Sequence, residues 1–339
     1  MNKQNQQILL ARRPEGMPTK ETFAFRDIPK DHPEDGQAVI KTLYLSVDPY
    51  MRGRMSAGKS YVEPFALNEP ISGGVVGEVV ESRSEKLKVG DKVQGLLNWQ
   101  LYNTVDAASV RKIENTDVPL SAYLSVLGMT GLTAYFGLLD IGQPKAGETV
   151  VVSGAAGAVG SIVGQIAKIK GARVVGIAGS DEKIRHLQEL GFDKGINYRT
   201  ADNLQKAVEE ACPNGVDVYF DNVGGSISDA VLNCLNDFAR VPLCGAISSY
   251  NIPEHEDLGP RIQPNLLKTR SMIKAFIIGD YSKDFDKGIK DLAEWLSQGK
   301  LKYKETMIEG FENVPKAFLG LFEGKNLGKQ LVKISDPSM

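Results

Sequence analysis

The sequence predicts a two-domain α/β protein in which a β-rich, barrel-like domain is combined with a doubly wound parallel sheet. Three observations support this fold class. The chain has 339 residues, which is enough for about two domains at roughly 150 residues each. Short strand-like runs fill its first third, and from Glu148 onward strand-like and helix-like segments alternate.

The first domain is predicted from short apolar runs that turn residues interrupt. Between about residues 8 and 120 these runs are AVIKTLYLSV, GGVVGEVVES, KVGDKV and GLLNW. Runs of this length and composition are typical of strands, so a barrel-like arrangement is expected. Residues 121–142 have apolar positions at mixed helical spacing, and the turn-forming segment GQPKAGE follows them. They are expected to form linker helices.

The second domain is predicted from the alternation that begins at Glu148. The expected strands are ETVVVSG, ARVVGIAG and the strand of GVDVYFDNVGG, which is followed by its loop. The expected helices are AVGSIVGQIAKIK and DEKIRHLQELG, the latter ending at Gly191. Such alternation builds a parallel sheet covered on both faces. After MIKAFIIG and a helix near 283–298, the segments KYKETMIEGF and KQLVKI are expected strands that return to the first domain. The expected domains are therefore 1–125, completed by 300–339, and 126–299.

The composition argues against several classes of partner. The hydrophobic fraction is 42%, and the formal net charge is -2, with lysine and arginine scattered among the acidic residues. No basic patch predicts binding to nucleic acid or to a membrane surface. No apolar stretch approaches 18 residues, and the first residues lack an apolar core of signal-peptide length. We therefore expect a cytoplasmic protein.

The cysteine and histidine pattern predicts neither disulfides nor a metal site. Cys212, Cys234 and Cys244 are odd in number and far apart, which is typical of reduced thiols. A structural zinc site needs closely spaced cysteine pairs, and a catalytic zinc site needs about three ligands. The histidines are His32, His186 and His255, and none has a nearby cysteine or second histidine. The sequence therefore predicts a metal-free protein.

The strongest local pattern is the segment 150–160, where a buried strand enters a turn of small residues and then a helix. Pyrophosphate binds the backbone N–H groups at a helix N-terminus, and glycines let the backbone approach it closely. Gly157 and Gly160 occupy the last two glycine positions of this pattern, whereas Ala155 replaces the first. We interpret the segment as a dinucleotide-binding turn. The alternative is that its small residues only permit close packing of helix on strand.

The end of the second strand indicates which nicotinamide is bound. NAD enzymes usually place an acidic residue about 20 residues beyond the glycines, where it binds the ribose 2′-hydroxyl. This chain has Gly179 and Ser180 there, with Lys183 in the first turn of the next helix. Such residues favour a 2′-phosphate, and hence NADP. The alternative is that Asp181, slightly later, serves the hydroxyl, although an acidic residue behind a Ser180 N-cap is also expected on helix-dipole grounds.

Longer motifs spread over essentially the whole chain resemble those of a known family. They are VDPYMRGRM (47–55), SGAAGAVGS (153–161), GSDEK (179–183), INY (196–198), FDNVGG (220–225), CGAISSYN (244–251), GFENVPKAF (310–318) and NLGK (326–329). They resemble the zinc-independent medium-chain reductases, specifically the leukotriene B4 dehydrogenase, prostaglandin reductase, alkenal double-bond reductase and curcumin-reductase-like group. The resemblance implies a GroES-like catalytic domain, an inserted Rossmann domain, NADPH in the interdomain cleft and a homodimer.

The resemblance also implies roles for individual residues. It implies that the pyrophosphate is bound by Gly157, Ala158, Val159 and Gly160, and that the 2′-phosphate is bound by Lys183 and Tyr198. It also implies that the rest of the cofactor groove is lined by Asn222, Cys244, Gly245, Ala246, Ile247, Ser248, Tyr250, Phe276, Ile277, Ile278 and Asn326. Each role has a simpler alternative: Lys183 as a solvated helix residue, Tyr198 as a strand-end aromatic, and Cys244 as a small buried hydrophobe. The segment ISGGVVGEVV lacks the histidine that zinc-dependent relatives have in this region.

The implied reaction is NADPH-dependent reduction of the carbon–carbon double bond of small enones and enals. Hydride reaches the β-carbon, a donor stabilises the enolate oxygen, and the α-carbon is protonated. Tyr50 and Tyr250 are the candidate donors, since a phenol donates at neutral pH, although a ribose hydroxyl or water could serve and Tyr50 could simply pack after Pro49. Where some relatives have a tyrosine before KAFII, this chain has PNLLKTRSM. A quinone reductase and a non-catalytic NADPH-binding protein remain alternatives.

Overall fold

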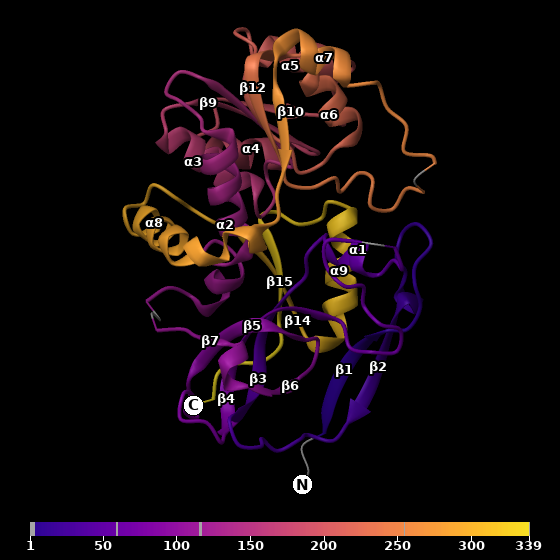
Figure 1. Cartoon of the computed structure of the whole chain (residues 1–339), viewed down its shortest axis with the longest axis vertical. Coiled ribbons are helices and arrows are strands. Elements are labelled where there is room, and N and C mark those ends of the chain that lie inside the picture. The colour runs from indigo at the N-terminus through magenta and orange to yellow at the C-terminus, as the bar shows by residue number, and fades with distance from the viewer. Residues whose placement is uncertain (1–3, 59, 115–116, 254, 339) are drawn as a thin grey trace. The chain divides into compact units, whose positions relative to one another are not determined.

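The computed structural model describes residues 4–58, 60–114, 117–253 and 255–338 (Figure 1). The chain forms two compact units. The first contains Met1–Leu124, Thr306–Asn326 and Gln330–Met339, and the second contains Ser125–Glu305 and Leu327–Lys329. Each unit has its own sheet. No helix within the described ranges is long and apolar enough to cross a membrane.

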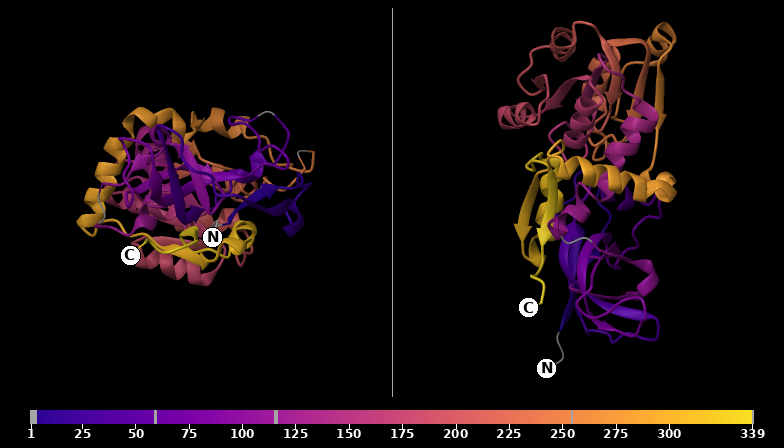
Figure 2. Two further views of the ribbon diagram at one scale, coloured as in Figure 1. Left: turned by 90° about the horizontal axis from the view of Figure 1, so that it is seen from below. Right: turned by 90° about the vertical axis from the view of Figure 1, so that its left-hand side faces the viewer.

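The first unit is built on a sheet of strand order β14-β15-β3-β4-β5-β7, with β6 added beside β3. Its strands are β3 (Gln37–Ser46), β4 (Ser72–Ser82), β5 (Lys92–Asn98), β6 (Tyr102–Asp106), β7 (Arg111–Lys112), β14 (Glu305–Glu309) and β15 (Lys329–Lys333). A separate antiparallel pair joins β1 (Asn5–Leu10) to β2 (Phe23–Ile28). Figure 2 shows β15, in yellow, beside β3, with which it pairs antiparallel.

Short helices and an apolar core complete the first unit. The helices include α1 (Met51–Arg54) and α9 (Val314–Phe322). Alternate strand residues point inward and meet one face of α9 in a core that contains Ile40, Trp99 and Phe318, all fully buried. The rings of Trp99 and Phe318 meet edge to face. The C-terminal segment therefore contributes both a strand and a core-packing helix to this unit.

The second unit is built on a parallel sheet of strand order β10-β9-β8-β11-β12-β13. Its strands are β8 (Thr149–Ser153), β9 (Arg173–Ala178), β10 (Lys194–Asn197), β11 (Val216–Phe220), β12 (Leu235–Leu243) and β13 (Met272–Ala275). Its helices are α2 (Met129–Phe136), α3 (Gly160–Ile169), α4 (Asp181–Glu189), α5 (Leu204–Ala211), α6 (Gly225–Leu232), α7 (Gln263–Thr269) and α8 (Phe285–Ser297), together with the π-helical segment η4 (Gly137–Gly142) and the 3-10 helix η5 (Ile278–Asp284). Figure 1 shows α3 and α6 on opposite sides of the sheet. This is the predicted doubly wound fold.

The strand order reverses between β8 and β11. From β8 the chain moves outward to β9 and β10, then returns to β11 on the other side of β8 and continues to β12 and β13. In open parallel sheets, ligands bind beyond the carboxyl ends of the strands at such a switch point. The topology therefore places the ends of β8 and β11, at Ser153 and Phe220, at the expected binding position.

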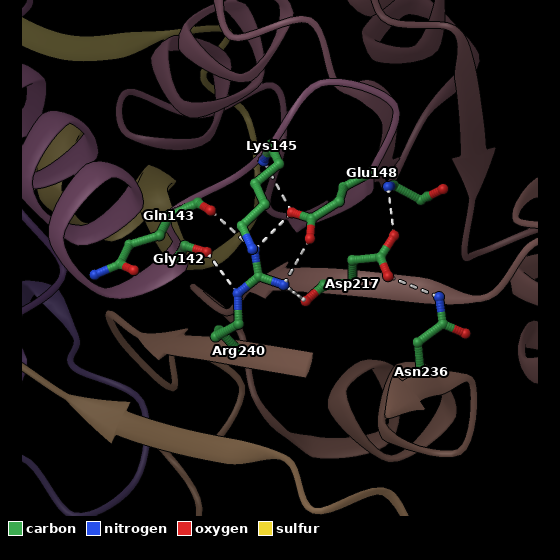
Figure 3. Close-up of polar contacts among 8 residues, drawn as sticks. Gly142, Gln143, Lys145, Glu148, Asp217, Asn236 and Arg240 are labelled. Carbon is green, nitrogen blue, oxygen red and sulfur yellow. Dashed lines mark hydrogen bonds and ion pairs between the residues drawn. The ribbon is translucent and has the colours of Figure 1, made fainter. Parts of the chain in front are cut away.

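The opposite, amino-terminal edge of this sheet is held by charged side chains (Figure 3). Arg240 Nε donates to Gly142 O at 3.0 Å, its Nη2 donates to Gln143 O at 2.9 Å, and Nη2 lies 2.6 Å from Glu148 Oε2. Asp217 accepts from the Thr149 backbone N–H at 2.8 Å. These bonds tie the end of η4 to β8, β11 and β12, far along the strands from the switch point.

One predicted strand segment is wrong in part. KVGDKV was expected to be strand throughout, but Lys88–Asp91 forms a turn, in which the Asp91 N–H donates to Lys88 O at 3.0 Å. Gly90 has a φ of 93° there, a conformation that glycine adopts without strain. Strand β5 starts only at Lys92.

Candidate nucleotide-binding site

The turn after β8 has the tight geometry that a dinucleotide-binding turn requires. The Gly157 N–H donates to Gly154 O at 2.9 Å, and helix α3 begins at Gly160. A Cβ on Gly160 would lie 2.5 Å from Gly154 O and 2.8 Å from the Ala155 Cα. The first N–H groups of a helix have no intrahelical acceptor. Glycine at 160 thus lets α3 start directly over the turn, so that the positive end of the helix dipole faces a position where an anion can bind. The Ser161 N–H bonds back to Gly157 O and the Ile162 N–H to Val159 O.

A segment of the second unit that is distant in sequence, Leu327–Lys329, contacts this turn. The Gly328 N–H donates to Ala156 O at 2.8 Å, and Gly328 forms a parallel bridge with Gly157. Gly328 has a φ of 69°, and a Cβ there would lie 2.0 Å from Lys304 O. Sequence reasoning assigned the NLGK motif only through Asn326. The structure shows that Gly328 of this motif contacts the turn after β8, at Ala156 and Gly157.

A cationic cluster surrounds Gly179 at the end of β9. A Cβ on Gly179 would lie 3.0 Å from the Tyr198 hydroxyl and 3.2 Å from Arg199 Nε. The Arg199 guanidinium lies 5.9 Å from the centre of the Tyr198 ring. Ser180 caps α4 by accepting from the Lys183 N–H at 3.3 Å. Burial and the charge of Arg199 both lower the pKa of Lys183, as expected for two cations held close together.

Arg199 is a residue that sequence reasoning missed. It follows Tyr198 directly in the chain, so the signal was present as one basic residue after the INY motif. Among the described residues, no carboxylate forms an ion pair with it. Asp181, the alternative partner for a ribose hydroxyl, instead accepts from Asn197 Nδ2 at 2.7 Å. The cluster therefore presents positive charge and a phenol, the donors that suit a phosphate.

The FDNVGG and CGAIS segments meet at the switch point. Asn222 donates through Nδ2 to Ser153 O at 2.8 Å, which fixes its side chain to the end of β8. The Ser248 N–H donates to Val223 O at 3.0 Å, and the Ser248 hydroxyl donates to the same oxygen at 2.6 Å. The structure therefore brings together Asn222, Cys244, Gly245, Ala246, Ile247 and Ser248, which were predicted from separate motifs.

Tyr250 lies against this loop. Its hydroxyl oxygen accepts from the Ala246 N–H at 3.4 Å, and a Cβ on Gly245 would come within 3.1 Å of it. Tyr250 is thus positioned by the CGAIS segment and belongs to the second unit. Glycine at 245 keeps the space beside the phenol open.

Tyr50 and Asn326 belong to the first unit. Burial and the Asp48 carboxylate raise the pKa of Tyr50, while Arg54 hydrogen-bonds to its hydroxyl and lowers the pKa somewhat. The phenol is therefore protonated at neutral pH and able to donate.

The side chain of Phe276 is packed against other rings of the second unit. It is 8% exposed, its ring meets the Phe220 ring edge to face, and a Cβ on Gly137 would lie 2.4 Å from its Cζ. The side chain is thus part of the core of the second unit, and only its backbone is left to contact a ligand. Ile277 is 37% exposed, and Ile278 begins η5.

The cysteines are free thiols of low acidity. Burial and the Asp221 carboxylate raise the pKa of Cys244 to about 12, so this thiol is neutral at physiological pH. Within the described part of the chain, no group of three histidine, cysteine or acidic side chains could hold a metal ion. Independence of metal stays a prediction.

A glycine-rich turn between the first strand and first helix of a parallel sheet, at its switch point, defines the second unit as a dinucleotide-binding domain. Two family models match the chain. "N-terminal domain of oxidoreductase" covers residues 6–113, and "Zinc-binding dehydrogenase" covers residues 158–294. The class of protein defined by fold and site is thus a nucleotide-dependent oxidoreductase.

Relatives are similar over the whole chain. The Bacillus subtilis protein YfmJ is 66% identical over 340 residues, covering 100% of both chains. The NADPH-dependent curcumin reductase of Escherichia coli is 44% identical, over 98% of this chain and 97% of the relative. The structure of CurA from Vibrio vulnificus in complex with NADPH has a TM-score of 0.93 and 45% identity, over 98% of this chain and 100% of that one.

The chain belongs to the zinc-independent medium-chain reductases, in the NADP-dependent group that includes curcumin, prostaglandin and 2-alkenal reductases. This membership confirms the predicted family, the predicted enzyme class and the predicted NADPH cofactor. It also agrees with the α/β fold.

Proposed function

We propose that the protein uses NADPH to reduce the carbon–carbon double bond of α,β-unsaturated ketones and aldehydes, with hydride added at the β-carbon. The observation that carries this proposal is whole-length similarity to reductases named for such substrates, since a 2-alkenal is an α,β-unsaturated aldehyde. The chemistry of the site agrees with this proposal, because the site contains phenols and cationic side chains that can donate hydrogen bonds to a phosphate.

The residues present fit this cofactor. Gly157, Ala158, Val159 and Gly160 would hold the pyrophosphate, because a Cβ at 160 would fill the turn. Lys183, Tyr198 and Arg199 would hold the 2′-phosphate, whose two negative charges would relieve the repulsion between the two cations. The remaining groove residues in this proposal are Asn222, Cys244, Gly245, Ala246, Ile247, Ser248, Tyr250, Phe276, Ile277, Ile278 and Asn326.

The chain's own residues orient the substrate and stabilise its charge. When bound, NADPH supplies the hydride. The developing enolate needs a hydrogen-bond donor at its oxygen, and the protonated phenol of Tyr50 is one candidate. Tyr250 is the second candidate, and Gly245 leaves space beside its hydroxyl. In this proposal the first unit, with its C-terminal segment, is the catalytic domain, and the second unit binds the nucleotide.

A substrate panel tests the proposal. Loss of NADPH absorbance is measured with purified protein and a long-chain enal, an aryl enone or a simple quinone as the acceptor. We expect faster turnover of the enal and the enone than of the quinone. Preferential turnover of the quinone would make the protein a quinone reductase, and no turnover of any acceptor would leave it a non-catalytic nucleotide-binding protein.

We further propose that the protein is a homodimer that works in the cytoplasm. Strand β13 is an edge strand of its sheet. Two apolar side chains are exposed at this edge: Met272 of β13 is 44% exposed, and Leu267 of α7 is 80% exposed. Parallel sheets normally keep such apolar edges covered, and a second copy can cover this one isologously. Light scattering should give twice the chain mass, and M272E should shift it toward the monomer. A monomeric wild-type protein would contradict the proposal.

A further inference from the structure

A buried carboxylate stands at the switch point of the second unit. Asp221 follows β11 directly and is 2% exposed. Its Oδ1 accepts from the Ser153 hydroxyl at 3.0 Å and from the Tyr219 hydroxyl at 2.8 Å. The same oxygen accepts from the N–H groups of Val223 and Gly224, both at 3.0 Å. One carboxylate therefore joins the end of β8 to β11 and to the loop that follows β11.

The backbone of Asp221 extends these connections to β12. Its N–H donates to Pro242 O at 3.0 Å, and its carbonyl accepts from the N–H groups of Cys244 and Gly245 at 2.8 and 3.1 Å. Ser153 completes the network, since its hydroxyl oxygen also accepts from the Asn222 N–H at 2.9 Å. The FDNVGG and CGAIS segments are thus both fixed to one residue.

The carboxylate has a specific chemical reason to be there. The groups around Oδ1 are all donors, and an ionised carboxylate offers only acceptors. Hydrogen bonds to a charged group are about twice as strong as neutral ones. Without the carboxylate, the N–H groups of Val223 and Gly224 would lose their acceptor inside the protein, and the loop would move to satisfy them. Gly224 has a φ of 71°, so the loop already has an uncommon conformation that the carboxylate helps to maintain.

We infer that Asp221 is a positioning residue for NADPH, which acts by holding Asn222–Gly225 and Cys244–Ser248 in their binding conformation. The inference rests on the cofactor groove of the proposed function. Asp221 itself is buried among Ser153, Tyr219 and the loop N–H groups, so it acts through its neighbours and not by contact with the cofactor.

The chain offers a matched control on the same strand. Asp217 lies at the opposite end of β11 and also accepts two hydrogen bonds, from the Thr149 N–H and from Asn236 Nδ2, both at 2.8 Å (Figure 3). Removal of either carboxylate should lower the melting temperature. Only the removal of the Asp221 carboxylate should disturb Asn222–Gly225 directly, because Oδ1 accepts from Val223 and Gly224. The disturbance should reach Cys244–Ser248 through the two bonds from Ser248 to Val223 O.

The experiment measures the Kd for NADPH by fluorescence titration without substrate, together with the melting temperature. We expect D221A to raise the Kd at least tenfold, D221N to raise it less because one amide oxygen still accepts, and D217A to leave it within twofold. With NADPH at saturation, kcat should fall much less than the KM for NADPH rises. S153A, which removes one donor from the network, should raise the Kd about threefold and carries the test if D221A does not fold.

Two outcomes would overturn the inference: a D221A or S153A protein that binds NADPH within twofold of the wild type, or equal weakening by D217A. The measurement needs no enone. Failure of the proposed reaction would therefore appear as normal NADPH binding without turnover, distinct from failure of this inference.

Discussion

At the scale of single residues, we expect the choice between the two nicotinamide cofactors to depend on the few side chains around Gly179. Lys183 and Tyr198 could be proposed from the sequence, because both lie in recognisable motifs. Arg199 lies just outside the INY motif, so it was not singled out from the sequence, although pairing of β10 with β9 brings it to Gly179 together with Tyr198. The Asp181 carboxylate accepts a hydrogen bond from Asn197, a contact that spacing along the chain does not reveal.

Substitution of the cations tests this cluster. We expect K183A to raise the KM for NADPH by an amount equivalent to roughly 1.5–3 kcal/mol, the usual contribution of a charge-assisted bond, with little change for NADH. R199A should act in the same direction but less strongly, because its side chain is exposed. Steady-state kinetics with both cofactors measure these effects.

Lys206 offers a control on the surface of α5, where it pairs only loosely with Glu210 at 3.9 Å. K206A should leave both KM values unchanged. If K183A impaired NADPH and NADH equally, Lys183 would be a solvated helix residue and the cluster would not select NADPH.

At the scale of elements, strands and helices with a regular pattern of residue types could be predicted from the sequence, whereas an irregular strand could not. The fully buried run of β8 and the caps of α4 were recognisable from residue types. Strand β12, LNDFARVPL, contains asparagine, aspartate and proline, which strands disfavour. Its pairing with β11 shifts register near Val218, and Phe238 has a φ of 62°. Such an irregular strand is stabilised by its neighbours, so its own sequence carries little signal.

The junction of β8 and α3 gives the prediction at this scale. We expect G160A to destabilise the protein by about 1–3 kcal/mol, the usual cost of overpacking, because its Cβ would meet Gly154 O at 2.5 Å. NADPH binding should weaken in the same variant. Urea unfolding and fluorescence titration measure the two effects.

Gly320 in α9 is the matched control, since the nearest atoms to a Cβ there are 3.9 Å away. Alanine at this helical position should stabilise the protein slightly. Tolerance of G160A with normal NADPH affinity would show that the turn does not need glycine at its third position.

At the scale of the whole molecule, the fold class was predictable, but several contacts within the two units were not. The family motifs span the chain, so the fold class followed from them. Gly328 and Asp221 were not assigned, because their roles come from bonds between segments distant in sequence: Gly328 with Ala156, and Asp221 with Ser153 and Cys244. The Phe276 side chain is 8% exposed and its ring packs against Phe220, contacts that the motif did not reveal.

The cysteines give a prediction about pH. Burial raises the pKa of Cys212 to about 12 and that of Cys234 to about 11, as it does for Cys244 with the help of Asp221. Only the thiolate reacts, and at pH 8 a group of pKa 11 is about 0.1% ionised. Iodoacetamide should therefore leave the native enzyme active at pH 8, and labelling should become about tenfold faster per pH unit up to about pH 10. Rapid inactivation at pH 8 would contradict these shifts, and denatured protein is the positive control.

Isotope labelling is the most direct test of conjugate reduction by this protein. The enzyme is incubated with an α,β-unsaturated ketone and NADPH that carries deuterium at the transferable position of the nicotinamide. Addition at the β-carbon spreads negative charge over an enolate, which a phenol such as Tyr50 or Tyr250 can stabilise. We expect a saturated ketone with deuterium on the β-carbon, whereas an allylic alcohol with deuterium on the carbinol carbon would show that conjugate reduction does not take place.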